Sequence, residues 1–226
     1  ALEAAQYLLN YIASNPRPKI RFHASDMILQ VESDAAFNAR PKGRSRAGGY
    51  RYLGSKSNDM LNAPILALPK VAKGAVGSAA EAEVAAIHMN AHEAAPTRQC
   101  LEEMGHPQPA ARARAGNAAA KGLASSTIKQ KRSKVFDRRF WWLKGREAQL
   151  QFHVIWEPGI YNLAGYPTKH HTGQHHKLAR PIYLYESGKS PRTIQECEAI
   201  LASGRPAKKA LLTIRRYKSL LAAAAA

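Results

Sequence analysis

Apolar residues near the start of the chain recur every three or four positions. They are Leu2, Ala5, Leu8, Leu9 and Ile12. This spacing is typical of one face of a helix. The dipeptide Asn15-Pro16 interrupts the pattern, because proline cannot continue a helix. The sequence therefore predicts a short N-terminal helix.

Three apolar segments follow, each short enough to be a strand. The first, DMILQVESDAAF, alternates around Ile28, Leu29 and Val31 and is expected to end at Asp34. A basic, glycine-rich turn, ARPKGRSRAGG, leads to the second segment, YRYLG. The third is APILALPKVA. We expect three strands in succession.

An alanine-rich stretch, SAAEAEVAAIHMNAHEAA, predicts a helix from about Ser78 to Ala94. Ser78 suits the N-cap, and Glu81 completes a capping box. Pro96 is expected to open a separate short helix that runs through Met104, since proline is favoured at the first helical position.

The remaining elements alternate between strand and helix. Strand-like stretches, ARARAG and LQFHVIWEPG, lie on either side of SKVFDRRFWWLKGREAQ, whose apolar positions share one helix face. A final helix is expected at Lys208–Leu221. This order predicts an α/β fold in which helices cover the faces of a mixed sheet.

The charge narrows the class of partner. The 226 residues carry a formal charge of +18, with a pI near 10.2. Such an excess attracts polyanions, so nucleic acid is the first expectation and an anionic membrane surface the second. No apolar run reaches the roughly 18 residues that a spanning helix needs. The two cysteines are too few for a disulfide framework and fit a reducing, intracellular compartment.

Basic residues gather in three places: a stretch from Lys129 to Arg146, the glycine-rich turn, and the tail. In the first stretch they are interleaved with aromatic side chains, of which Phe136, Phe140 and at least one tryptophan are expected to be buried. An exposed aromatic there could stack on an unpaired base. The residues predicted to contact nucleic acid are Arg44, Arg46, Lys129, Lys131, Arg132, Lys134, Arg138 and Arg139.

Four long stretches, in order, resemble the ribonuclease H domain of copia-type retrotransposon polyproteins. They are FHASDMILQVESDAAFNARPKGRSRAGGY, SAAEAEVAAIHMNAHEAAPTRQCLEEMGHPQP, TIKQKRSKVFDRRFWWLKGREAQLQFHVIWEPG and NLAGYPTKHHTGQHHKLARPIYL. The match looks closest to the copia-like elements of algal genomes. It divides the chain into a helical lead-in (1–20), a ribonuclease H-like domain (21–185) and a basic C-terminal extension (186–226).

The resemblance implies a ribonuclease H-like, five-stranded mixed sheet flanked by helices, and cleavage of RNA in RNA–DNA hybrids. That chemistry uses two divalent ions held by four acidic residues. Two of the acids match: Asp34, in ESDAAF, and Glu83, in AEVAAI, which fits the pattern better than Glu81.

The other two acids do not match. Where the family has aspartate in a Thr-Asp-Asn-Ser stretch, this chain has Gly116, in RAGNAAA. Where the family has aspartate in Leu-Ala-Asp-Tyr, this chain has Gly165. Asn117 could supply only a neutral carbonyl oxygen. Because magnesium depends on carboxylate ligands, we expect hydrolysis to be lost or severely impaired.

Four histidines, at positions 170, 171, 175 and 176, follow this motif. Thr172-Gly173 favours a loop here, and no cysteine is close in sequence, so no metal site is predicted. If a metal were bound, His171 and His175 would be the pair to hold it. Paired histidines also follow this motif in the algal elements, so the resemblance accounts for the cluster.

We therefore expect a catalytically inactive, retroelement-derived domain that binds RNA or an RNA–DNA hybrid and needs no cofactor. A structural role beside other proteins in a large ribonucleoprotein, such as an organellar ribosome, would suit the charge. The alternative is an active, magnesium-dependent ribonuclease H, and a third possibility is a protein-interaction role. The sequence does not distinguish a mitochondrial from a nuclear location.

Overall fold

The computed structural model describes residues 2–57, 60–72, 74, 76–116, 122, 134–185 and 192–203. For residues 134–137 only the backbone is described. The expected helix at Lys208–Leu221 lies outside these ranges, as do the basic residues between positions 129 and 133. No helix within the described ranges has the length and apolarity needed to cross a membrane.

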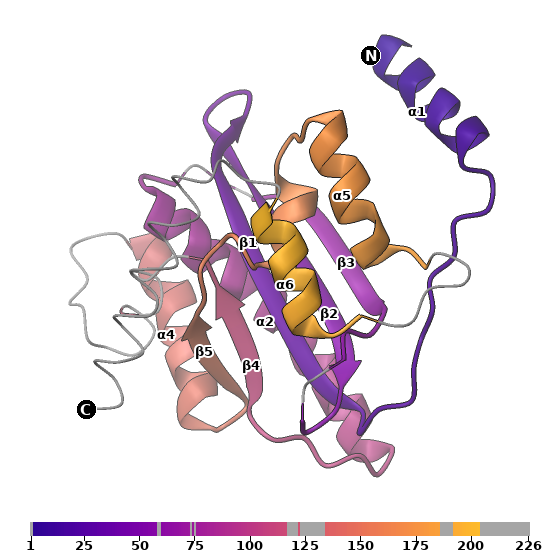
Figure 1. Cartoon of the computed structure of the whole chain (residues 1–226). Coiled ribbons are helices and arrows are strands. Elements are labelled where there is room, and N and C mark those ends of the chain that lie inside the picture. Colours follow the sequence, from indigo (N-terminus) through magenta and orange to yellow (C-terminus); the bar gives the residue numbers. More distant parts are fainter. Residues whose placement is uncertain are drawn as a thin grey trace.

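A single mixed sheet forms the centre of the molecule (Figure 1). Its strands are β1 (Ile28–Arg40), β2 (Arg44–Gly54), β3 (Pro64–Val71), β4 (Ala111–Ala115) and β5 (Phe152–Trp156). They lie in the order β3-β2-β1-β4-β5, with β1, β2 and β3 antiparallel and β4 and β5 parallel to β1. The predicted five-stranded mixed sheet is therefore confirmed.

Helices cover both faces of the sheet (Figure 1). The helices of the described residues are α1 (Leu2–Ser14), α2 (Ala79–Glu103), α4 (Lys134–Ala148), the 3-10 helix η1 (Leu163–Thr168), α5 (Gly173–Tyr183) and α6 (Ile194–Ser203), and all but α1 pack on the sheet. One face packs against α2 and α4, and the other against η1, α5 and α6. Helix α1 was predicted, but it contributes no buried residue.

Alternation along the strands supplies two cores. On the α2 face, Leu29 and Val31 of β1 meet Phe140 and Leu143 of α4. On the opposite face, Tyr50 and Tyr52 of β2 pack with residues of η1, α5 and α6. Side chains two apart on a strand share a face, so β1 contributes Leu29 and Val31 to one core and β2 contributes Tyr50 and Tyr52 to the other. A sheet covered on both faces is the result.

Strands β1 and β2 are longer than their apolar patterns predicted. β1 does not end at Asp34 but continues to Arg40, and Arg44 already belongs to β2. The turn between them is only Pro41–Gly43, where Lys42 and Gly43 adopt positive φ. Backbone pairing extends the strands beyond the apolar residues, because polar residues pair as well as apolar ones at the rim of a sheet.

Helix α2 is one continuous element and not two. Ser78 caps it as predicted, accepting a hydrogen bond from the Glu81 backbone N–H. Pro96 does not start a new helix, because Leu101 beyond it packs into the same core as Ala91 before it. Tertiary packing outweighs the single hydrogen bond that proline removes.

The core does not end at residue 185, the predicted domain boundary. Ile194, Cys197 and Leu201 of α6 are buried against the sheet. The first part of the supposed basic extension therefore belongs to the folded domain. The spacing of Ile194, Cys197 and Leu201, three and then four residues apart, is a sequence signal that predicts a helix with one buried face.

Gly48 lies where the backbone of η1 comes closest to the sheet. A Cβ at this position would stand 2.6 Å from the carbonyl oxygen of Ala164 and 2.3 Å from Cγ2 of Thr168. We expect Gly48→Ala to lower the free energy of unfolding by about 1–3 kcal/mol, measured by urea denaturation, because the overlap forces η1 away.

Gly145→Ala in α4 is the matched control, since a Cβ there meets nothing within 4 Å. It is expected to raise stability by about 0.5–1 kcal/mol, as alanine favours a helix over glycine. Equal effects of the two substitutions would contradict the close approach at Gly48.

Candidate nucleic-acid site

Asp34 is the centre of the candidate site. It lies on β1 with 2% of its surface exposed. Its Oδ2 accepts hydrogen bonds from Thr168 Oγ1 at 2.5 Å and from Lys169 Nζ at 2.9 Å. Both partners stand at the end of η1. A carboxylate buried to this degree needs such donors, because it has lost its water.

Asn162 positions η1 over Asp34. As the N-cap of η1, its side chain accepts from the Ala164 backbone N–H, and its Nδ2 donates to the carbonyl oxygen of Ser33 at 2.6 Å. The cap thus fastens η1 to the residue next to Asp34. Sequence reasoning missed Asn162, Thr168 and Lys169, although an asparagine at the start of NLAGYPT is a recognisable N-cap signal.

Glu83 approaches the same point from the first turns of α2 and is 7% exposed. Burial raises its pKa to about 8, the charge of Asp34 adds to this, and Lys169 and a backbone hydrogen bond from Ala35 oppose it. Its Oε2 has no hydrogen-bond partner among the described residues. Glu83 is therefore largely protonated at neutral pH. The predicted pair of acids is brought together.

The two glycines at the expected acid positions border this pair. A Cβ at Gly116 would lie 3.5 Å from Asp34 Oδ1 and 3.6 Å from Glu83 Oε1. A Cβ at Gly165 would lie 3.8 Å from Asp34 Oδ2 and 3.6 Å from Lys169 Nζ. Neither glycine has a positive φ, so a side chain would fit without backbone strain. Positions 34, 83, 116 and 165 therefore lie close together.

These residues do not fit a pair of divalent ions. Within the described part of the chain, no group of three or more His, Cys, Asp or Glu side chains could hold a metal. The charge of Asp34 is balanced by Lys169 at 2.9 Å, and positions 116 and 165 carry no side-chain oxygen. A divalent cation needs several oxygen ligands and would meet an ammonium at the oxygen it requires.

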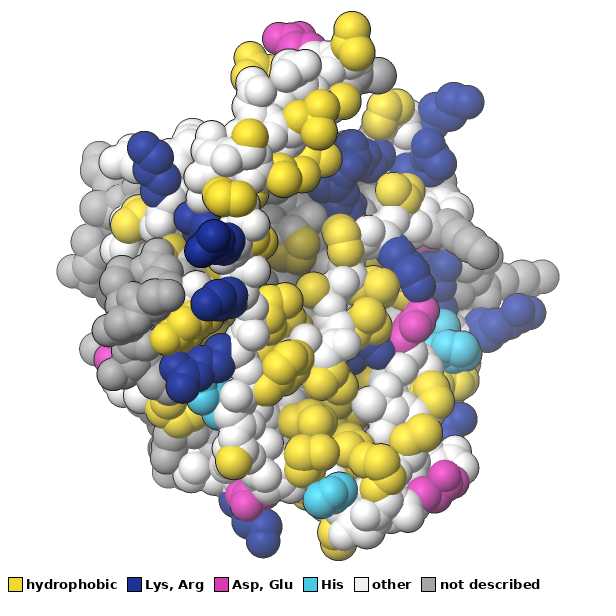
Figure 2. Space-filling view, turned by 90° about the vertical axis from the view of Figure 1, so that its right-hand side faces the viewer, with side chains coloured by type: hydrophobic (Ala, Val, Ile, Leu, Met, Phe, Trp, Pro, Cys, Tyr) yellow, Lys and Arg dark blue, Asp and Glu magenta, His cyan; other side chains and the backbone are white. Residues whose placement is uncertain are grey.

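The predicted nucleic-acid residues fall on two sides of the sheet. Arg46 pairs with Ala36, two residues from the pair Asp34–Gly48, so it shares the face of Asp34. Arg138 and Arg139 stand on α4, on the opposite face. The side chains of Lys129, Lys131, Arg132 and Lys134 lie outside the described residues. Figure 2 shows Lys and Arg side chains spread over the right-hand side of Figure 1, with few acidic ones between them.

The aromatic residues of α4 divide as expected between core and surface. Phe140 is buried and Trp142 packs against the core, whereas Trp141 is 61% exposed. Lys144 Nζ lies 5.0 Å from the Trp141 ring centroid. Trp141 is thus the exposed aromatic that could stack on a base. The Phe136 side chain lies outside the described residues.

The histidine cluster is an aromatic stack. Helix α5 begins at Gly173 with Thr172 as its N-cap, so the predicted loop is wrong for His175 and His176. The rings of His171 and His175 stack at 4.4 Å with 22° between planes, and His171 also stacks on Tyr166. The lone pair of a histidine ring nitrogen lies in the plane of its ring. Because the two rings are stacked nearly parallel, these lone pairs do not point at a common metal ion.

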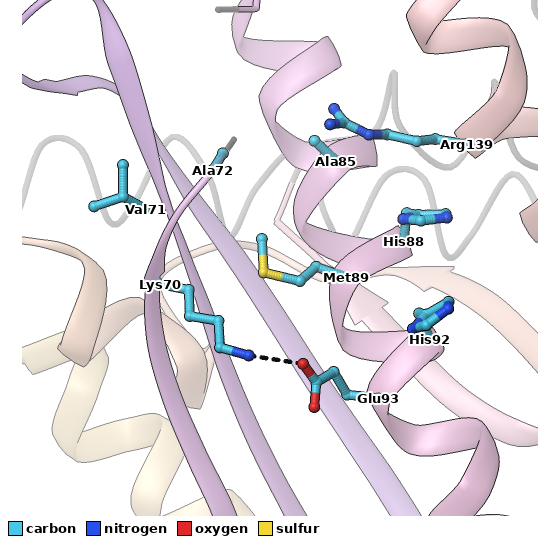
Figure 3. A pocket seen from close by; sticks show the side chains of 9 residues that line it. All are labelled: Lys70, Val71, Ala72, Ala85, His88, Met89, His92, Glu93 and Arg139. Carbon is cyan, nitrogen blue, oxygen red and sulfur yellow. Dashed lines mark hydrogen bonds and ion pairs between the residues drawn. The ribbon is translucent and has the colours of Figure 1, made fainter. Parts of the chain in front are cut away.

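A separate cavity of about 460 Å³ lies between the end of β3 and the side of α2. Figure 3 shows Lys70 reaching across to Glu93, with which it forms an ion pair at 2.7 Å. Burial lowers the pKa of His88 in this cavity to about 4, and the charges of Arg139 and His92 add to the effect. His88 is therefore neutral at pH 7. The cavity does not include Asp34 or Glu83.

No family model matches the chain, and no curated protein matches its sequence. Three solved structures are similar at low identity. Ribonuclease H1 of the archaeon Halobacterium salinarum is 12% identical, covering 62% of this chain and 93% of that one, with a TM-score of 0.42. The N-terminal ribonuclease H domain of a Mycobacterium tuberculosis protein is 12% identical, covering 58% and 83%, with a TM-score of 0.43.

The protease–reverse transcriptase of prototype foamy virus is 11% identical and covers 58% of this chain and 17% of that one, with a TM-score of 0.34. Likenesses at this level carry no argument about activity. The fold class follows from the sheet itself, a five-stranded mixed sheet in the order β3-β2-β1-β4-β5 that is flanked by helices.

Proposed function

We propose that this protein is a ribonuclease H-like domain that binds RNA or an RNA–DNA hybrid without cleaving it. The observation that carries the proposal is the state of the Asp34 site, where Lys169 balances Asp34 and glycines occupy the two neighbouring positions at which the resemblance implies acids. The net charge of +18 supplies the attraction to phosphate. Derivation from a copia-type element and a structural place in a ribonucleoprotein, with protein neighbours, belong to the same proposal.

The second candidate, a magnesium-dependent ribonuclease H, is favoured by the meeting of Asp34 and Glu83. A cleavage assay on an RNA–DNA hybrid, with magnesium and with manganese, distinguishes the two. The proposal expects no cleavage above background with either ion. Turnover that disappears when Asp34 is changed to asparagine would establish the enzyme instead.

Binding is tested with a fluorescein-labelled RNA hairpin in a salt titration. Affinity should fall steeply with salt, because bound lysines and arginines displace counterions from phosphate. We expect Arg44→Glu with Arg46→Glu to weaken binding at low salt by about tenfold and to reduce the salt slope by about 2.

Arg138→Glu with Lys144→Glu makes the same change of charge on α4, the other side of the sheet. It should weaken binding less, if the nucleic acid binds on the face of the sheet that carries Asp34. An equal loss for both pairs would indicate a non-specific effect of net charge, and salt-independent binding would favour a protein-interaction role.

A further inference from the structure

Lys169 holds an unusual position beside Asp34. Its side chain is 34% exposed, whereas that of its partner Asp34 is 3% exposed. The ammonium therefore stands between a buried carboxylate and solvent. A lysine ammonium has three N–H donors, and the described structure records one hydrogen bond from it, to Asp34 Oδ2.

The oxygen that Lys169 contacts is already crowded. Asp34 Oδ2 also accepts from Thr168, whose hydroxyl is buried and bonded in addition to the carbonyl oxygen of Gly165. Position 165 itself is next to the ammonium, at 3.6 Å from a Cβ built there. One positive charge, carried on the chain, thus fills the place where an ion would have to meet Asp34.

We propose that Lys169 is a tethered cation, which neutralises Asp34 on one side and donates to a phosphate of the bound nucleic acid on the other, without any divalent ion. The nucleic-acid part rests on the proposed function. Compact, strongly hydrated ammonium groups are suited to phosphate as point charges.

Arg46 provides a second cation on the same face. Gly48, the partner of Asp34 in β2, lies directly under Thr168. Arg46 is two residues before Gly48 in β2, about 7 Å along the backbone by the rise of a strand, and points to the same side. Lys169 and Arg46 therefore place two cations on the face of the sheet that carries Asp34.

The test uses the full chain and the labelled hairpin, with either magnesium or EDTA present. The unchanged protein should bind equally in both, within about twofold. Lys169→Met should weaken binding by about five- to tenfold and lower the salt slope by about 1. Lys177→Met, on the exposed side of α5, makes the same change of net charge and should alter affinity by less than about twofold.

Two results would overturn the proposal: equal losses for Lys169→Met and Lys177→Met, or hairpin binding by the unchanged protein that needs magnesium. Should Lys169→Met fail to fold, reductive methylation of the unchanged protein replaces it. The hairpin should then protect Lys169 more than Lys177, and equal protection would contradict phosphate contact.

A manganese titration tests the tethered cation separately from nucleic-acid binding. Gly116→Asp with Gly165→Asp supplies two carboxylates, and free manganese is followed by electron paramagnetic resonance. Adding Lys169→Met to that pair should tighten manganese binding by at least about tenfold, because the ammonium no longer competes.

Equal manganese affinity with and without Lys169 would refute the proposal that the Lys169 ammonium occupies the cation position beside Asp34. If the unchanged protein binds no hairpin at all, the proposed function fails, and the phosphate contact fails with it. The manganese comparison still decides whether Lys169 holds the cation position.

Discussion

Replacing Arg114 with methionine is expected to lower the free energy of unfolding at pH 8 by about 3–5 kcal/mol, because it leaves buried carboxylates without a counterion. Arg114 stands on β4 and forms ion pairs with Glu32 at 3.0 Å and with Glu157 at 3.3 Å. Glu32 is 1% exposed. Burial raises its pKa to about 8 even though Arg114 opposes the shift, and Glu157 and Glu198 add to it.

The measurement is urea denaturation at pH 8 and at pH 5. The loss should be smaller at pH 5, since protonation removes the charges that Arg114 balanced. Arg112→Met, two residues away and exposed, is the control and should change stability by less than about 0.5 kcal/mol. Glu32→Gln combined with Arg114→Met should recover part of the loss. A loss independent of pH would argue that Arg114 acts through packing alone.

Glu83→Gln should stabilise the protein at pH 8 by up to about 5 kcal/mol, at 1.36 kcal/mol for each pKa unit between 4.5 and about 8. The sign follows from proton binding. Between these values the folded protein keeps the proton of Glu83 and the unfolded chain loses it. The contribution of Glu83 to the free energy of unfolding is therefore fully present below pH 4.5 and is lost as the pH rises towards 8.

Unfolding curves at a series of pH values from 4 to 9, roughly the window of that titration, would check this expectation. In Glu83→Gln, the free energy of unfolding should decrease less steeply as the pH rises. The decrease that comes from Glu32 should remain, because burial raises the pKa of Glu32 in the same way. Asp34 and Lys169 face Glu83 and are unchanged in this variant. Glu103→Gln, at the exposed end of α2, should reproduce the original profile. An unaltered slope in Glu83→Gln would mean that Glu83 is ionised in the folded protein.

Local patterns predicted the elements well where packing agreed with them. The helix capped by Ser78 and the amphipathic helix around Phe140 were both found. The predictions failed where long-range contacts decided the outcome. Pro96 is a local stop signal, yet Leu101 continues the buried face of α2. Helix α6 was read as part of a polar extension, although Cys197 is buried under the sheet.

The candidate site was predicted only in part, for a similar reason. Asp34 and Glu83 came from the resemblance, and the structure places them together with Gly116 and Gly165. Lys169 was overlooked because its meaning depends on a contact across more than 130 residues, from η1 to β1. The predicted nucleic-acid residues were not assigned to a face of the sheet, whereas the structure places Arg46 and Arg138 on opposite faces.

By itself, the sequence determined the net charge of +18, the order of the five strands, and the absence of carboxylates at positions 116 and 165, because composition and local periodicity carry these properties. Only the tertiary structure decided that Lys169 forms the ion pair with Asp34. It also decided that burial raises the pKa of Glu83, and that Arg46 shares the face of the sheet on which Asp34 lies. Those outcomes depend on burial and on distances between elements remote in the chain, which no local pattern contains.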